Sequence, residues 1–256
     1  MFSLQDGHFL DILNLVFTKI TSMDIIYSRK VNTNELPNGA IAEVNLFCIE
    51  VKNVNEYAMH LTNKISDTSW ISSLDYISQD AYNICAEKTI NKLVELFNLP
   101  ENKVTSDFGE YLVSLSSGEC LESKHSHTCL PISEIWKESK EGNPGFDFHT
   151  LSTSNKINFG EAKYQSNGNA YTSAAAQTHR FSREKKDRGD SVHLKNMVSK
   201  VAIDNLVLHN KKGYVVSFSI NSQDHSEILN NSLNNNDIKE LTKLCDELYI
   251  IGVKVK

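Results

Sequence analysis

The chain has 256 residues, of which 40% are hydrophobic and 23% charged, and its formal net charge is −6. This composition is typical of a folded globular protein with one large domain, or with a core and a smaller appendage. No segment approaches the roughly 18 apolar residues of a membrane-spanning helix, so we expect no membrane partner. The negative net charge gives no support to nucleic-acid binding by the chain as a whole.

Two features of the sequence predict a cytoplasmic protein. The N-terminal stretch MFSLQDGHFLDILNLVF has an acidic residue and no basic region ahead of its apolar part, unlike a signal peptide. The five cysteines are odd in number and lie scattered along the chain, at positions 48, 85, 120, 129 and 245. This distribution is typical of reduced thiols rather than of disulfides.

The hydrophobic pattern predicts alternating helices and strands, and therefore an α/β fold. In the first half it predicts a strand in 39–53, a helix that follows the Ser78-Gln79-Asp80 cap and ends at 99–103, and a helix after Ser106-Asp107 followed by a polar stretch in 116–128. In the second half it predicts strands around Ile135 and Trp136, in 145–150 and in 156–164, helices in 169–186 and 193–210, a strand in 213–220, a helix in 238–248 and a closing strand in 248–256. Residues 1–100 form an N-terminal α+β region without a catalytic constellation, which suits a docking surface.

Three charged residues interrupt the two strands GFDFHT and KINFGEAKY. Side chains alternate along a strand, so Glu161 and Lys163 share a face, and pairing of the two strands brings them toward Asp147. Two carboxylates at one point repel each other unless a cation lies between them. Mg²⁺ prefers such hard oxygen ligands, and the carbonyl of Ala162 is a further candidate ligand. Lys163 beside the metal would stabilise charge that develops on a phosphate.

An acidic strand residue, a turn and then Glu-x-Lys before a helix resemble the motif of the PD-(D/E)xK nuclease superfamily. The resemblance implies a restriction-endonuclease-like αβββαβ core in 101–256 and a Mg²⁺-dependent deoxyribonuclease, with Mn²⁺ as an alternative metal. It also implies a metal-supporting role for Glu110, in the preceding helix, and a site-facing role for Gln177, in the following one. One departure is that Pro144 lies three residues before Asp147 instead of adjoining it.

A narrower resemblance covers 106–220, through the segments FGEYL, PGFDFH and FGEAKYQ and the alanine-rich helix that follows. These segments resemble the nuclease subunit (HamA-type) of the Hachiman antiphage defence system. That resemblance implies an ATP-dependent helicase partner in a heterodimer, which would hold the nuclease inactive until it meets suitable DNA.

A basic segment follows the predicted site. Between positions 180 and 200 there are seven lysines and arginines against three acidic residues. We expect DNA-phosphate contacts from Arg180, Arg183, Lys185 and Lys186. The alternative is an ordinary solvated helix face.

Other constellations have weaker support. Cys120, His125, His127 and Cys129 are four zinc-type ligands within ten residues, but their spacing fits no common zinc motif. The sequence has neither a G-x-S-x-G elbow nor a phosphate-binding P-loop. The main alternative to a nuclease is a catalytically inactive nucleic-acid-binding or regulatory subunit with a nuclease-like fold.

Overall fold

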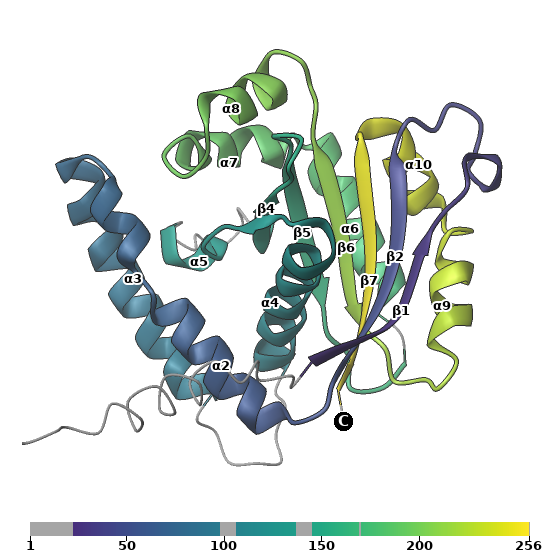
Figure 1. Cartoon of the computed structure of the whole chain (residues 1–256), viewed down its shortest axis with the longest axis horizontal. Coiled ribbons are helices and arrows are strands. Elements are labelled where there is room, and N and C mark those ends of the chain that lie inside the picture. The colour runs from purple at the N-terminus through teal and green to yellow at the C-terminus, as the bar shows by residue number, and fades with distance from the viewer. Residues whose placement is uncertain (1–22, 98–105, 137–144, 169, 256) are drawn as a thin grey trace, which may run out of the picture.

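The computed structural model describes residues 23–97, 106–136, 145–168 and 170–255. Seven strands form one mixed sheet (Figure 1). The strands are β1 (Met23–Lys30), β2 (Glu43–Val51), β3 (Thr128–Cys129), β4 (Phe148–Leu151), β5 (Ile157–Lys163), β6 (Gly213–Ser219) and β7 (Glu247–Val255). Their order in the sheet is β1-β2-β7-β6-β5-β4-β3. The four central strands β2, β7, β6 and β5 are parallel, and the flanking strands pair antiparallel at both edges.

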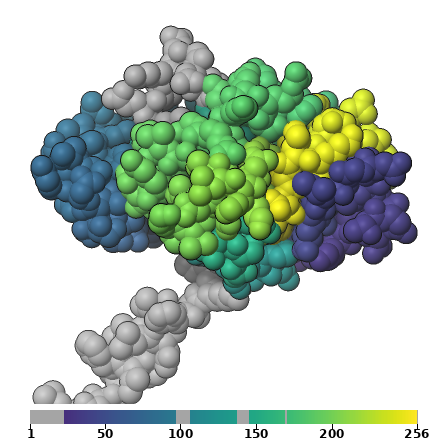
Figure 2. All heavy atoms as spheres, turned by 90° about the horizontal axis from the view of Figure 1, so that it is seen from above, coloured from purple at the N-terminus to yellow at the C-terminus, as the bar shows by residue number. Residues whose placement is uncertain are grey.

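Helices cover both faces of the sheet. They are α2 (Val54–Ser66), α3 (Tyr76–Phe97), α4 (Ser106–His125), α5 (Ser133–Trp136), α6 (Tyr171–Arg183), α7 (Lys186–Leu194), α8 (Lys200–Val207), α9 (His225–Ser232) and α10 (Asn236–Leu244), with 3-10 turns η1 (Thr33–Glu35) and η2 (Ser69–Ser73). Helix α4 crosses one face, and α6, α9 and α10 lie on the other (Figure 1). Helix α3 forms one end of the molecule (Figures 1 and 2). Within the described part of the chain, no helix is long and apolar enough to cross a membrane.

The α/β prediction is confirmed, and the central strands explain why. Strands β6 and β7 read GYVVSFS and ELYIIGVKV, and nearly all of their residues are buried, as expected for parallel strands covered on both faces. In chain order, α4, β3, β4, β5, α6 and β6 follow one another, with α5 inserted after β3 and with α7 and α8 inserted after α6. Strands β1 and β2 join this same sheet through the pairing of β2 with β7, so residues from both sides of position 100 share it.

Two predictions in the middle of the chain are wrong. Ile135 and Trp136 lie in the short helix α5 instead of a strand, and the indole Nε1 of Trp136 donates to the carbonyl of Pro131 at 2.8 Å. The strand of this region is β3, which pairs with β4. The stretch expected to be a polar loop is the second half of α4, where small residues such as Ser117 and Gly118 are buried and let the helix approach β3.

Helix boundaries also differ from the prediction. Helix α3 begins before the predicted cap, because the Asp75 carboxylate accepts hydrogen bonds from the backbone N–H groups of Ile77 and Ser78. The predicted end of that helix, at 99–103, lies outside the described residues. The single helix expected in 193–210 is divided between α7 and α8, and Ser199 caps the second of these through the N–H of Ala202.

A glycine in β5 permits a close contact beside the predicted catalytic residues. Gly160 pairs with Phe148 across the β4–β5 ladder. A Cβ atom at position 160 would lie only 2.3 Å from the Phe148 ring, which packs directly over the backbone. The aromatic ring therefore fixes the β4–β5 register at the level where the acidic residues meet.

We predict that Gly160→Ala lowers the free energy of unfolding by about 1–3 kcal/mol, because the buried Phe148 ring has to move. Gly189→Ala is the matched control, since a Cβ atom added at that position of helix α7 would meet no atom within 4 Å. Alanine there should stabilise the protein by about 0.5–1 kcal/mol, owing to its higher helix propensity. Urea unfolding measures both. Equal stability of Gly160→Ala and wild type would contradict the close contact.

Candidate active site

Four of the predicted site residues lie together at one end of the β4–β5 pair. Asp147 immediately precedes β4, Glu161 and Lys163 lie on β5, and Glu110 lies near the start of α4. The ammonium of Lys163 lies 3.1 Å from the Glu161 carboxylate and 3.4 Å from the Glu110 carboxylate. Lys163 and Glu110, which are 53 positions apart in the sequence, are thus in contact.

The Asp147 side chain is anchored on the neighbouring strand. Its Oδ2 accepts a hydrogen bond of 2.8 Å from the backbone N–H of Ala162, and its own N–H donates to the carbonyl of Gly160 at 2.9 Å. The N–H and the C=O of one strand residue point to the same side of the strand, so the carbonyl of Ala162 also faces the Asp147 side. This places both predicted metal ligands, the Asp147 carboxylate and the Ala162 carbonyl, on one edge of β5.

Glu161 is the most unusual residue of the site. Its side chain is 0% exposed, and apart from the Lys163 ammonium 3.1 Å from Oε1, neither carboxylate oxygen has a hydrogen-bond partner among the described residues. Burial raises the pKa of Glu161 well above its usual value of 4.5, and the neighbouring charge of Asp147 raises it further, against the opposing effect of Lys163. A buried carboxylate that lacks hydrogen bonds is costly, and a bound cation is one of the few ways to retain its charge.

One ammonium faces three carboxylates in this cluster. Burial alone would lower the pKa of Lys163, but Glu161, Asp147 and Glu110 together raise it, so the lysine stays charged. Its side chain is 21% exposed and that of Glu110 is 37% exposed, which leaves the cluster open to solvent on the α4 side. The group carries a formal excess of negative charge when all three acids are ionised.

The donor set fits a hard divalent cation. The Asp147 and Glu161 carboxylates and the Ala162 carbonyl are the oxygen atoms that would hold such a cation, and Glu110 would hold a further water from α4. Mg²⁺ is commonly held by one or two carboxylates and keeps several waters, whereas a structural zinc site requires a full protein shell. No group of three His, Cys, Asp or Glu side chains in the described ranges is arranged around a common metal position, so a cation here would depend on the Ala162 carbonyl and on waters as well as on carboxylates.

Gln177 lies at the level of the site along helix α6. At one end of the helix, Tyr171 packs on Phe218, which pairs with Lys163; at the other end, Phe181 packs on Phe146, the neighbour of Asp147. Gln177 lies between these two contacts and is half-buried, and its side chain makes no hydrogen bond to any described residue. The structure therefore places Gln177 on the part of α6 that passes the site. It makes no hydrogen bond to the site carboxylates among the described residues.

The basic residues follow Gln177 at the end of α6. Arg180, Arg183 and Lys185 are exposed, with the Arg180 guanidinium 5.1 Å from the Phe181 ring centre. Lys186 is half-buried, and its ammonium lies 3.9 Å from the Glu184 carboxylate. Since His179 faces α10 through Asp237, Arg180, the next residue, projects from a different side of the helix. Arg183, four residues after His179, lies on the His179 side instead, so the cations spread around the end of α6.

The four residues considered as zinc ligands serve the core instead. The His127 ring nitrogens face the Thr150 hydroxyl at 2.9 Å and the Tyr249 hydroxyl at 3.3 Å, and burial lowers the pKa of His127 to about 4. Burial likewise raises the pKa values of Cys120 and Cys129 to about 12, which disfavours thiolates. His125 packs against Phe47 and Tyr249.

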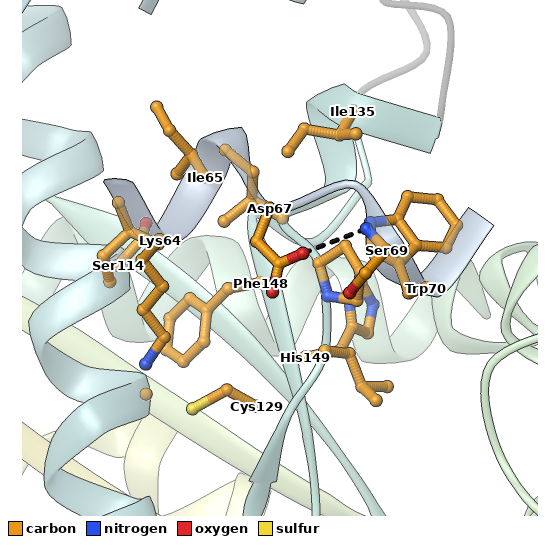
Figure 3. A pocket seen from close by; sticks show the side chains of 15 residues that line it. Lys64, Ile65, Asp67, Ser69, Trp70, Ser114, Cys129, Ile135, Phe148 and His149 are labelled. Atoms are coloured by element: carbon orange, nitrogen blue, oxygen red, sulfur yellow. Dashed lines mark hydrogen bonds between the residues drawn. The ribbon is translucent and has the colours of Figure 1, made fainter. Parts of the chain in front are cut away.

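A cavity of about 250 Å³ lies on the α4 side, between the α2–η2 segment, α4, β3, α5 and β4 (Figure 3). Its walls include Trp70, Ile135, Phe148 and His149 and are largely apolar. None of Glu110, Asp147, Glu161 and Lys163 lines it, so we do not place the predicted chemistry in this cavity.

Sequence reasoning missed two residues that lie beside Asp147. The Ser133 N–H donates to the Asp147 carbonyl at 3.1 Å, and the Ser133 hydroxyl donates to the Phe146 carbonyl. Burial raises the pKa of Tyr111, the neighbour of Glu110, and the nearby charges of Glu134 and Asp147 raise it further. No motif marks either residue, because both reach the site through the packing of separate segments.

Comparison with models of known protein families gives no match, and comparison with curated protein sequences gives none.

We predict that Glu161→Gln raises the free energy of unfolding by at least about 1 kcal/mol at pH 8 in the presence of a chelator, because it removes an unsolvated charge. The raised pKa of Glu161 means that the folded protein holds this proton more tightly than the unfolded chain does. Wild-type stability should therefore fall as the pH rises from about 4.5 through the folded-state pKa, and the advantage of the variant should vanish near pH 4.5.

Addition of Mg²⁺ at pH 8 should stabilise the wild type and leave Glu161→Gln nearly unchanged, since only the wild type offers the second carboxylate. Denaturant unfolding with chelator and with Mg²⁺ measures both effects. A variant that is less stable than the wild type in chelator would show that the charge of Glu161 is well compensated by the protein alone.

Proposed function

We propose that this chain is a metal-dependent DNA nuclease that hydrolyses phosphodiester bonds, built on a restriction-endonuclease-like αβββαβ core. One observation carries the proposal: Glu161 is fully buried next to Asp147, and among the described residues its carboxylate has an ion pair with Lys163 at 3.1 Å but no hydrogen bond from the backbone or from a neutral side chain. A purely structural acid at this depth would be expected to have hydrogen-bond partners. The order of helices and strands around it supports the same conclusion.

Each residue of the site has a role in this proposal. A divalent cation, when bound, would supply positive charge that stabilises the negative charge on the phosphate. Asp147, Glu161 and the Ala162 carbonyl would hold it, and Glu110 would support it from α4. Lys163, whose ammonium stays protonated, would hydrogen-bond the attacking water or the phosphate as charge develops. Gln177 would orient the phosphate or the water from α6.

The surface at the end of α6 would bind the DNA backbone. Arg180, Arg183, Lys185 and Lys186 follow the helix that passes the site, so a strand held by them would extend toward the carboxylates. Contacts of this kind bind phosphates and carry no base sequence information. DNA is accordingly the proposed substrate, without sequence specificity.

The resemblance to Hachiman nucleases extends the proposal to antiphage defence with an ATP-dependent helicase as partner. A cytoplasmic nuclease without sequence specificity would damage its host chromosome, so a partner that restrains it is a physical requirement of this role. The N-terminal region would then contribute to the docking surface of a heterodimer. Separate elution of the two co-expressed chains in size-exclusion chromatography would contradict the complex.

One observation favours the alternative of an inactive nucleic-acid-binding or regulatory subunit. Lys163 contacts both Glu161 and Glu110, so the cluster has an internal counter-ion even without metal. The alternative predicts DNA binding without cleavage, and the following experiment separates the two functions.

We predict that Glu161→Ala, Lys163→Ala and Asp147→Asn each reduce Mg²⁺-dependent DNA cleavage by at least about 100-fold, because each removes a group that acts on the transition state. Glu122→Ala is the control, since Glu122 is an exposed acid of the same helix as Glu110 and pairs with Lys64. Plasmid and linear DNA are incubated with the purified protein, alone and with the proposed partner. Wild-type cleavage by Glu161→Ala would refute the metal-site assignment.

We also predict that charge reversal of Arg183, Lys185 and Lys186 weakens DNA binding and flattens its dependence on salt. The slope of log affinity against log salt should fall by roughly 0.9 for each phosphate that the variant no longer neutralises. Reversal of Lys88, Lys92 and Lys211, three exposed lysines outside this basic segment, provides a control with the same change in net charge. Fluorescence anisotropy at several salt concentrations gives the slopes. An equal slope for both triple variants would assign the α6 cations to an ordinary solvated surface.

A further inference from the structure

The backbone on both sides of Asp147 is held by one residue of α5. The Ser133 hydroxyl donates to the carbonyl of Phe146, and the Ser133 N–H donates to the carbonyl of Asp147 at 3.1 Å. The amide between these two carbonyls belongs to Asp147 and is bound to Gly160 on β5. Both peptide groups that flank Asp147 are therefore fixed, and they set the direction in which its carboxylate points.

Ser133 also contacts a buried histidine of β4. The His149 Nδ1 lies 3.5 Å from the Ser133 hydroxyl, and its Nε2 lies 3.2 Å from the Asp190 carboxylate on α7. All three residues are buried. The network ties α5 to β4 and α7 while the serine hydroxyl donates to the Phe146 carbonyl.

Helix α5 is in turn attached to α3. The Thr89 hydroxyl donates to the carbonyl of Glu134 at 2.9 Å, and the Cys85 thiol approaches the same carbonyl at 3.7 Å. A second link runs from Tyr82 on α3 to the His193 ring on α7 at 3.1 Å. Because α5 has only four residues, these outside contacts decide its position more than its own helical hydrogen bonds do.

We propose that Ser133 is a positioning residue for the Asp147 carboxylate, and that α3 holds Ser133 in place through the Thr89–Glu134 contact. The inference rests on the proposed metal-dependent function. It adds that the position of the Asp147 carboxylate depends on α3, the helix at one end of the molecule. A displacement of α3 would move α5, and through α5 it would move Asp147. Figure 3 shows the cavity beside this connection, with Ile135 of α5 and His149 of β4 in its walls.

The expected effect is a loss of metal affinity. Groups that orient a metal ligand without touching the metal typically contribute 10- to 100-fold to affinity or activity. Ser133→Ala should therefore raise the Mn²⁺ concentration for half-saturation by about 10-fold. Thr89→Val, which keeps the shape and removes the hydroxyl, should raise it by a smaller factor. Cleavage by both variants should recover toward wild type at saturating metal, since the ligands themselves are intact.

The test measures Mn²⁺ binding by calorimetry without DNA, and then the Mg²⁺ dependence of cleavage. The controls are Ser232→Ala and Thr62→Val, whose hydroxyls donate to the helix carbonyls of Leu229 and Ala58. Both controls remove the same kind of hydrogen bond as their test variants, and neither contacts α5. They should lose some stability and keep wild-type metal affinity.

The outcomes are separable. Metal affinity equal to the wild type in Ser133→Ala, with only a loss of stability, overturns the inference and leaves the nuclease assignment standing. If Ser133→Ala does not fold, the metal affinity of Thr89→Val is compared with that of its control, Thr62→Val. Equal metal affinity of these two variants overturns the inference. A wild-type protein that binds no Mn²⁺ and cuts no DNA overturns the proposed function, and this inference with it.

Discussion

A single buried carboxylate determines how this site has to be built. Glu161 lies within a strand that is paired on both sides, and it is closed off from water. Its charge costs free energy there unless a cation compensates it, and the nearby Asp147 increases that cost. Lys163 compensates part of the charge. The sheet brings Lys163 beside this carboxylate, and helix α4 and the segment before β4 bring Glu110 and Asp147 to the same place.

Local patterns in the sequence are sufficient to predict the β4–β5 hairpin, which carries most of the site. Period-two alternation in KINFGEAKY places Glu161 and Lys163 on one face, and this depends only on strand geometry. The short run around Ile135 and Trp136 misleads, because a few apolar residues fit a buried helix as well as a buried strand. The second half of α4 resembles a loop because it is rich in serine. Its burial depends on contact with β3, which no local pattern reveals.

Ser133 and Tyr111, which sequence reasoning missed, both reach the site through the packing of separate segments. Ser133 donates to backbone carbonyls, and a serine that does so has no sequence signature. Gln177, by contrast, could be named from the resemblance, but its distance from the carboxylates depends on how α6 packs along β5. Contacts that depend on long-range packing therefore cannot be predicted from the residues alone. The α4 glycines make the same point: Gly109 is required because the Tyr164 ring occupies the space of a Cβ atom.

The order of strands has a consequence for synthesis of the chain. Strand β7 lies between β2 and β6. Residues 43–51 and residues 213–219 therefore lack one of their neighbouring strands until residues 247–255 have been synthesised. Strand β7, in the middle of the sheet, is consequently missing until Val255 has left the ribosome. The pairing of β2 with β7, which joins residues about 200 positions apart, therefore forms last. A nascent chain that stops short of β7 leaves two parallel strands with open edges, which makes it a target for chaperones and proteases.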